Sequence, residues 1–309
     1  MKRAAESVSA GDTALIDGLV IANRRRRHAV RFDDGESLEC ALKGRRLFVA
    51  CGDRVRVARA AGGGVIEEIL PRSTLFYRSD AFNEKLIAAN VTQVIGVVAP
   101  GLGVDLELVD RWMVAAEAEG CRFVIVANKA DMPDFTTLLG RLELVAKLGY
   151  AVVAMSAKHD AAPLLPFLVD ERTALIGQSG MGKSTILNAL VPGANARTAE
   201  ISEALSTGRH TTSQSTLYPL GEAIDSGWIV DSPGLKAFGV AHVAPDALAH
   251  AFVEIRPLIG LCRFRDCRHD REPGCAVQQA VARGEIAPHR VGLLHRLIEE
   301  SDSVRDPAR

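Results

Sequence analysis

The chain has 309 residues, enough for two or three domains, and its hydrophobic content of 48% and charged content of 24% are ordinary for a globular protein. Its formal net charge of −1 excludes a uniformly basic nucleic-acid-binding protein, so any RNA contact has to come from local basic patches. The sequence has neither an apolar run of about 18 residues nor an apolar signal core, so we expect no membrane contact, no export and a cytoplasmic location.

Short strand signals separated by tight turns fill residues 14–69. Asp33-Asp34-Gly35 is typical of a hairpin turn, and the residues on either side have strand character. Because no long helical pattern interrupts these signals, the sequence predicts a small five-stranded barrel of the OB type. We place it in a first domain that spans residues 1–72.

The predicted barrel carries the basic run Arg24-Arg25-Arg26-Arg27-His28. This run is either a solvated hairpin or a contact to RNA phosphates, since barrels of this type often bind nucleic acid. Aromatic residues for base stacking are scarce here, and we expect Phe32 and Phe48 in the barrel core instead.

An α/β sheet is predicted after a connector at residues 70–90, because strand and helix signals alternate. Near-continuous apolar runs, which suit parallel strands covered on both faces, occupy residues 94–99, 123–127 and 151–155. Helical spacing appears at residues 106–119 and in a second apolar face formed by Leu138, Leu139, Leu142, Val145 and Leu148.

The second of these strands ends in Asn128-Lys129-Ala130-Asp131, an N-K-x-D tetrapeptide. One carboxylate can accept hydrogen bonds from both guanine N1–H and the exocyclic amino group, so Asp131 would select guanine over adenine. Asn128 and Lys129 would brace the loop and cover the base. The third strand is followed by Ser156-Ala157-Lys158, which suits an auxiliary guanine-binding loop. Alternatively, both segments are ordinary polar loops.

A phosphate-binding loop is indicated by Gly177-Gln178-Ser179-Gly180-Met181-Gly182-Lys183-Ser184-Thr185, which has the pattern G-x-x-x-x-G-K-S. A buried strand at residues 172–176 precedes it and a helix at residues 186–191 follows, as the motif requires. Backbone N–H groups and the helix N-terminus would hold the phosphates. Lys183 would reach the outer phosphates, and Ser184 would ligate Mg²⁺.

Two switch segments are predicted downstream. Asp231-Ser232-Pro233-Gly234 is a D-x-x-G motif, in which Asp231 would hold Mg²⁺ and the Gly234 N–H would sense the γ-phosphate. A threonine of the segment 206–213 would complete the Mg²⁺ shell; Thr211 and Thr212 both remain open, and we count Thr212 among the candidate catalytic residues.

The order of these motifs is unusual, because N-K-x-D precedes the phosphate loop and D-x-x-G comes last. A Ras-like domain keeps the same sheet if its original N- and C-termini are joined and the chain is cut at another loop. The motif order therefore predicts a circularly permuted Ras-like GTPase domain at residues 73–240. The cut falls just after D-x-x-G and ties the second switch covalently to whatever follows.

A zinc site is predicted in the last domain, residues 241–309. Cys262, Cys267, His269 and Cys275 have the spacing C-x₄-C-x-H-x₅-C, and three thiolates with one imidazole form a closed, structural tetrahedral site. The alternative is a loop with free thiols. Nearby arginines either contact RNA phosphates or form a solvated face, and helices are predicted at residues 276–283 and 291–298.

The motif order, with a barrel before it and the cysteine–histidine pattern after it, resembles the bacterial circularly permuted GTPases that depend on the small ribosomal subunit, the ribosome small-subunit GTPase A family. The resemblance covers nearly the whole chain and includes stretches such as Gly208-Arg209-His210-Thr211-Thr212 and Glu272-Pro273-Gly274-Cys275. It implies a late maturation factor, expected as a monomer, that binds ribosomal RNA and hydrolyses GTP chiefly on the small subunit. Ser213 departs from the threonine expected after Thr212.

Hydrolysis by the isolated protein is expected to be slow. In Ras-like enzymes a glutamine just after D-x-x-G orients the attacking water, and here that position is Leu235. His210 is the internal candidate for this role, and its alternative is a solvent-facing histidine. Two other functions compete: a P-loop ATPase or small-molecule kinase, which Asp131 argues against, and an RNA-binding module that uses GTP only as a structural ligand.

Overall fold

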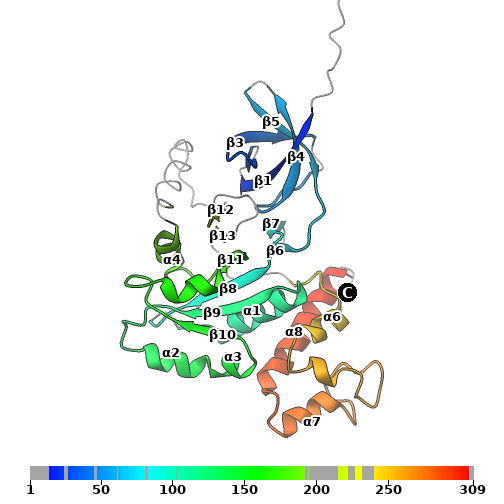
Figure 1. Ribbon diagram of the computed structural model, residues 1–309. Helices are drawn as coiled ribbons and strands as arrows, with labels where there is room; N and C mark the ends of the chain where they lie inside the picture. The colour runs from blue at the N-terminus through cyan, green and yellow to red at the C-terminus, as the bar shows by residue number, and fades with distance from the viewer. Residues whose placement is uncertain are drawn as a thin grey trace, which may run out of the picture.

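The computed structural model describes residues 14–23, 27–44, 47–60, 62–80, 83–101, 103–191, 194, 215–221, 227–231 and 240–305. Three parts follow one another: a barrel, a central α/β sheet with helices on both faces, and a C-terminal helical unit (Figure 1). No helix in the described ranges is both long enough and apolar enough to cross a membrane.

Five strands close the N-terminal barrel, as predicted. They are β1 (Leu15–Asn23), β2 (His28–Arg31), β3 (Ser37–Leu42), β4 (Arg54–Ala60) and β5 (Gly63–Ile69). Their order is β1-β2-β3-β5-β4, and β4 pairs back onto β1, while β3 and β5 run parallel. Alternate residues such as Val55 and Val57 point inward, which gives a small apolar core that includes Phe32.

Phe48 does not join this core. Its side chain is 72% exposed, whereas Phe32 is 2% exposed. The expectation that both phenylalanines are buried is therefore wrong for Phe48. Phe32 directly follows the regular strand β2, whereas Phe48 lies in the irregular segment between β3 and β4. Strand alternation therefore gives no prediction of the direction of the Phe48 side chain.

Residues 70–90, expected as a connector, contain an antiparallel hairpin of β6 (Leu75–Asp80) and β7 (Asn83–Ala89). The central sheet follows with strand order β10-β9-β8-β11-β13-β12. Its strands are β8 (Gln93–Val98), β9 (Arg122–Ala127), β10 (Ala151–Ala154), β11 (Arg172–Ile176), β12 (Thr216–Pro219) and β13 (Trp228–Asp231). All these strands are parallel except β12, which is antiparallel to β13.

Both faces of the central sheet are covered, because successive side chains of a strand point to opposite faces. Val94 and Val98 of β8 pack in the same core as α1 (Leu106–Ala118). Ile95 and Val97 pack on the other side with α4 (Lys183–Leu190), near the 3₁₀ helix η1 (Ala162–Phe167). This explains why the strand reads as a continuous apolar run.

The predicted helical face at residues 138–148 is divided between two short helices, α2 (Phe135–Arg141) and α3 (Glu143–Lys147). Leu138, Leu142 and Val145 are nevertheless all buried. The predicted apolar face is therefore correct, but the prediction of a single continuous helix is wrong. The junction residue Leu142 has φ −92° and ψ 1°, which departs from the regular α-helix and separates the two segments.

The C-terminal unit contains α6 (Pro245–His250), η2 (Arg256–Leu258), α7 (Ala276–Ala282) and α8 (Pro288–Arg305), and it packs against α1 (Figure 1). Arg290 of α8 is 1% exposed; its Nε lies 2.6 Å from Glu254 Oε1 and its Nη1 lies 3.3 Å from Asp110 Oδ1 of α1. Since a buried guanidinium needs paired carboxylates, this contact fixes the unit on the central domain.

The barrel is joined to the central sheet by backbone pairing. Ala22 of β1 pairs with Thr216 of β12, so one sheet continues from the central domain into the barrel. Gly52 lies against Trp228 of β13, and a Cβ at Gly52 would lie 2.3 Å from the Ala89 carbonyl. Only a glycine allows this close approach at φ +88°.

Candidate nucleotide-binding and metal sites

Four candidate segments follow parallel strands at one edge of the central sheet. N-K-x-D follows β9, Ser156-Ala157-Lys158 follows β10, the phosphate loop follows β11, and Asp231 ends β13. Ligands of open α/β sheets bind at the carboxyl ends of the strands, and here the candidate residues gather at that edge. Segments separated by about a hundred residues along the chain thus face a common space.

Asn128 connects three of these loops. Its side chain is 2% exposed, its Nδ2 donates to the Met181 carbonyl over 3.0 Å, and its Oδ1 accepts from the Ala157 N–H over 2.9 Å. The first contact reaches the phosphate loop and the second reaches the Ser156–Lys158 loop. The asparagine therefore sets the spacing between the candidate base-binding and phosphate-binding loops, a role that local sequence could not indicate.

Asp131 points its carboxylate toward solvent beside Ser156. The Ser156 hydroxyl donates to Asp131 Oδ1 over 2.5 Å, and this hydrogen bond is the main reason why the pKa of Asp131 is lowered. His159 Nε2 lies 4.0 Å from the other carboxylate oxygen, a neighbour that the sequence analysis missed. An ionised, accessible carboxylate can accept two adjacent N–H donors of a guanine.

The backbone of N-K-x-D is held in an uncommon conformation. Lys129 has φ +61°, in the left-handed region, and the Ala130 N–H donates to the Met155 carbonyl over 3.1 Å. Such a conformation persists only where the surroundings fix it, and functional loops are frequent locations.

Glycines shape the phosphate loop. At Gly182, with φ +96°, a Cβ would lie 2.2 Å from Asn128 Nδ2, and at Gly177 it would lie 2.5 Å from the Val97 carbonyl. Helix α4 begins at Lys183 with no side-chain cap on its N-terminal N–H groups. Ser184 and Thr185 stand exposed in its first turn. Free N–H groups at a helix start are suited to bind an anion.

Lys183 of the phosphate loop and Asp231 at the end of β13 are a pair of interacting charges. Lys183 Nζ donates to the carbonyls of Gly177 and Gln178, at 2.5 and 3.0 Å. Burial lowers the pKa of Lys183 and raises the pKa of Asp231, and each charge partly offsets the shift of the other. The Lys183 ammonium is half-buried, so a phosphate placed beside it would gain a stronger electrostatic contact than it would in bulk water.

The predicted switch residues lie mostly outside the described residues. These are His210, Thr211, Thr212 and Gly234, together with Ser213 and Leu235. Their roles therefore stay predictions.

The four predicted zinc ligands come together. His269 Nδ1 lies 3.5, 3.7 and 3.6 Å from the sulfurs of Cys262, Cys267 and Cys275, and the Cys262 and Cys275 sulfurs are 3.9 Å apart. A tetrahedral zinc with ordinary bond lengths requires about 3.6 Å between nitrogen and sulfur and about 3.8 Å between sulfurs. The donor set and its dimensions therefore fit one structural Zn²⁺.

The surrounding chain holds the zinc ligands in place. The Glu272 carboxylate accepts from the N–H groups of Arg268 and Asp270, and Gln278 Nε2 donates to the His269 carbonyl over 2.6 Å. Cys275 also caps the start of α7. The other three cysteines, Cys40, Cys51 and Cys121, are buried singly in other parts of the chain, and none of the six forms a disulfide.

Comparisons with known proteins identify the family. The family model described as RsgA GTPase matches residues 69–241. A "Small ribosomal subunit biogenesis GTPase RsgA" of Nitrosospira multiformis is 46% identical over 94% of this chain and 93% of its own length. The protein of the same name from Nitrosomonas europaea is 44% identical over 92% of this chain and 91% of its own.

Solved structures agree in fold. YjeQ from Thermotoga maritima is 29% identical, with a TM-score of 0.70 over 93% of this chain and 99% of that protein. YloQ, described as a circularly permuted GTPase, has a TM-score of 0.67 at 24% identity over 96% of this chain and 99% of that protein. A family of this kind uses GTP or GDP with Mg²⁺. With its permuted motif order, OB-like barrel and Cys₃His cluster, the chain belongs to the RsgA GTPase family and is a GTP-hydrolysing enzyme.

Proposed function

We propose that one guanine nucleotide binds across the loop edge of the central sheet. Asp131 receives the base, Asn128, Lys129 and Ala130 shape its loop, and Ser156, Ala157 and Lys158 line the other side. Residues 177–185 hold the phosphates, and Ser184 and Asp231 hold Mg²⁺. The observation that carries this proposal is the Asn128 side chain, hydrogen-bonded to both Met181 and Ala157.

For hydrolysis, Lys183 balances charge on the outer phosphates, since its ammonium is already held at the loop. Mg²⁺, when bound, neutralises charge that develops on the phosphate oxygens. Thr211 or Thr212 completes the Mg²⁺ shell, the Gly234 N–H senses the γ-phosphate, and His210 positions the attacking water. Leu235 has no polar atom for that task, so turnover by the isolated chain is slow and rises when the small subunit supplies the missing group.

The biological role that we propose is a late maturation or checkpoint step on the small ribosomal subunit, carried out in the cytoplasm by a monomer that contacts ribosomal RNA. Support comes from the names of the relatives. We propose that the chain is divided into three domains at residues 1–72, 73–240 and 241–309. The outer two domains contact RNA, and GTP hydrolysis releases the protein.

Contacts between the domains support a mechanical link to the nucleotide. The segment after Asp231 leads directly to the zinc unit, whose Arg290 and Glu300 meet Asp110 and Arg111 of α1. GTP-dependent ordering of the switches would therefore move or fix the zinc unit.

Co-sedimentation with purified small subunits in GDP, GTP and a non-hydrolysable GTP analogue, read with phosphate release, tests this role. We expect tighter binding with the analogue than with GDP and faster turnover with subunits. Equal binding in all three states would contradict the cycle. His210→Ala should lose the stimulated turnover and keep GTP affinity; unchanged turnover would remove His210 from the mechanism.

The same experiments separate the competing functions. An ATPase would bind ATP in competition with GDP, which the Asp131 carboxylate disfavours because adenine lacks the paired donors. An RNA-binding module with a structural nucleotide would bind subunits without faster phosphate release.

A further inference from the structure

The chain enters and leaves the central domain beside one carboxylate, that of Glu119 at the C-terminal end of α1. On the way in, β6 begins at Leu75, shortly after the last strand of the barrel. On the way out, residues 240–243 lead to α6 of the C-terminal unit. Leu75 and His242 are 44 and 123 positions from Glu119 in the chain, and both contact its side chain.

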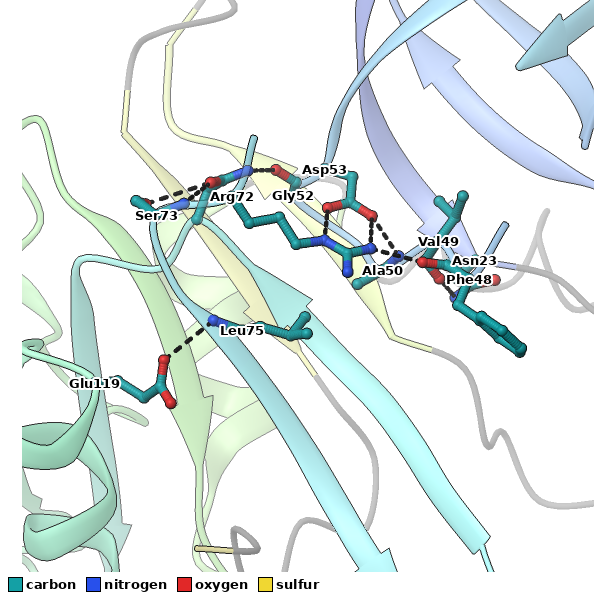
Figure 2. A network of polar contacts seen from close by, with 11 residues as sticks. Asn23, Phe48, Val49, Ala50, Gly52, Asp53, Arg72, Ser73, Leu75 and Glu119 are labelled. Atoms are coloured by element: carbon teal, nitrogen blue, oxygen red, sulfur yellow. Dashed lines mark hydrogen bonds and ion pairs between the residues drawn. The ribbon is translucent and has the colours of Figure 1, made fainter. Parts of the chain in front are cut away.

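Each oxygen of this carboxylate has its own partner. Oε2 accepts from the Leu75 N–H over 3.2 Å (Figure 2), and Oε1 lies 3.1 Å from His242 Nε2. The Glu119 side chain is 19% exposed, and burial raises the pKa of its carboxyl group while the Leu75 N–H opposes that rise. A carboxylate largely withdrawn from water loses more when a donor is removed than one on the surface does, so both contacts hold Glu119 in place.

The imidazole of His242 has a second neighbour. Its ring centroid lies 4.5 Å from that of Tyr77 in β6, and the two ring planes are inclined by 58°. Tyr77 is buried, so its own ring is held by the surrounding side chains. An aromatic contact together with a hydrogen bond to a carboxylate restricts the imidazole more than an isolated ion pair on an open surface would.

The residues on either side of His242 are fixed as well. Val240 and Val243 are both buried, and the Val243 N–H donates to the Val240 carbonyl over 2.9 Å, which closes a β-turn. The Val243 carbonyl accepts from the hydroxyl of Ser301 in α8 over 2.7 Å, and Ser301 is buried too. Residues 240–243 therefore form a tight turn that is attached to α1, β6 and α8 at once.

This turn follows the D-x-x-G motif closely in the chain. Asp231 ends β13, nine positions before Val240. The residues between these two lie outside the described ranges, but both ends are placed: Asp231 by the pairing of β13 with β11, and the other end by the contacts of Glu119. A chain segment with both ends fixed has fewer conformations than one with a free end, so ordering it around a ligand costs less entropy.

We propose that Glu119 and His242 are positioning residues for GTP hydrolysis: their contact fixes the downstream end of the D-x-x-G segment, so that less entropy is lost when the segment meets the γ-phosphate. This inference rests on the roles proposed above for Asp231 and Gly234. Both residues of the pair act through the chain that follows Asp231, and α1 and β6 are their fixed support. A contact that only stabilised the fold would not distinguish GTP from GDP.

The test uses the full chain with His242→Ala and His242→Gln. In His242→Ala, affinity for a non-hydrolysable GTP analogue should fall by roughly 3- to 10-fold, kcat of the isolated chain should fall by a similar factor, and GDP affinity should not change. The amide of His242→Gln offers an N–H donor to Glu119 and should restore most of the loss. His250→Ala, which changes an exposed histidine on α6, is the control and should match the wild type.

A double-mutant cycle tests whether the two side chains act together. Glu119→Ala removes the acceptor of both His242 and Leu75, so it should weaken binding of the GTP analogue at least as much as His242→Ala does. If the two residues act through one contact, the double variant should bind the analogue no more weakly than Glu119→Ala alone. Losses that simply add would overturn the pairing.

Two further results would overturn the positioning role. One is an equal loss of affinity for GDP and for the GTP analogue in His242→Ala; the other is a lower unfolding temperature with unchanged binding of both nucleotides. Asp231→Asn tests the proposed site separately, through affinity for the GTP analogue in the presence of Mg²⁺. If that variant binds the analogue as the wild type does, the proposed role of Asp231 fails. If it binds more weakly and His242→Ala does not, only the role of the Glu119–His242 contact fails.

Discussion

The side-chain amide of Asn128 and the backbone carbonyl of Met181 are joined by a 3.0 Å hydrogen bond between two loops that lie 53 positions apart in the chain. Burial of the asparagine makes this bond costly to break, because an unpaired buried amide loses the contact without regaining water. The separation between base and phosphates in the proposed site therefore depends on one side chain.

Gly182→Ala should disrupt this connection. A Cβ at position 182 would lie 2.2 Å from Asn128 Nδ2, and the backbone has φ +96°. We expect affinity for a fluorescent GDP analogue to fall at least roughly tenfold, equivalent to about 1.4 kcal/mol. The matched control is Gly140→Ala, since nothing lies within 4 Å of the added Cβ there and its φ is ordinary. Equal affinity in the two variants would contradict the predicted role of the bridge.

Asp131→Asn should change which base is bound. The variant replaces two acceptor oxygens by one acceptor and one donor, which matches the N1–H and carbonyl of xanthine instead of the paired donors of guanine. We expect GDP affinity to fall by roughly 10- to 100-fold and xanthosine diphosphate to compete better than GDP. Asp134→Asn, whose side chain makes no helix-capping hydrogen bond, is the control. Unchanged preference for GDP would show that Asp131 does not bind the base.

Zinc content should depend on Cys267. Metal analysis of the purified wild-type chain should give about one zinc per chain, and Cys267→Ser should hold much less, since a hydroxyl is a poor replacement for a thiolate ligand. Cys40→Ala, which changes a barrel cysteine outside the cluster, should keep its zinc. Thermal unfolding should begin at a lower temperature in Cys267→Ser than in the wild type, because Cys275, which caps α7, loses its fixed neighbours. Equal zinc content in all three proteins would contradict the site.

Acid should destabilise the barrel through His28. The side chain is 4% exposed, neither ring nitrogen has a hydrogen-bond partner within the described part of the chain, and burial lowers its pKa below the ordinary 6.5. Between the lowered pKa of folded His28 and 6.5, the unfolded chain binds a proton that the folded barrel does not bind. The free energy of unfolding therefore has its full value above pH 6.5 and decreases as the pH falls below 6.5.

In the wild type, the titration of His28 should lower the free energy of unfolding by up to about 1.4 kcal/mol per pH unit between pH 7.5 and about 5.5. His28→Leu removes the titrating group, so its urea midpoint should change less over the same pH range. His250→Gln, an exposed histidine on α6, is the control and should keep the wild-type pH dependence. The same pH dependence in wild type and His28→Leu would show that other groups carry it.

Much of the central domain follows from sequence because its signals are strong and local. The strand at residues 172–176 has the predicted bounds, since an apolar run ends at the glycine that opens the phosphate loop. The Cys₃His cluster was likewise predictable, because metal chemistry fixes both residue types and spacing.

The missed elements have weak local signals. The four-residue strand β12 ends in Pro219, and proline argues against a strand. The hairpin of β6 and β7 has neither Asn-Gly nor Asp-Gly between its strands. The contacts of Asn128 and the exposure of Phe48 are set by segments remote in sequence, so no local pattern could have indicated them.

The single sheet that runs through the Ala22–Thr216 pair has a consequence for shortened forms of the protein. If the barrel is removed, β12 loses its pairing with β1 and becomes an edge strand with exposed backbone donors and acceptors. Separate molecules can extend such an edge strand by strand, so a truncated nucleotide-binding domain is expected to aggregate where the intact chain stays dispersed.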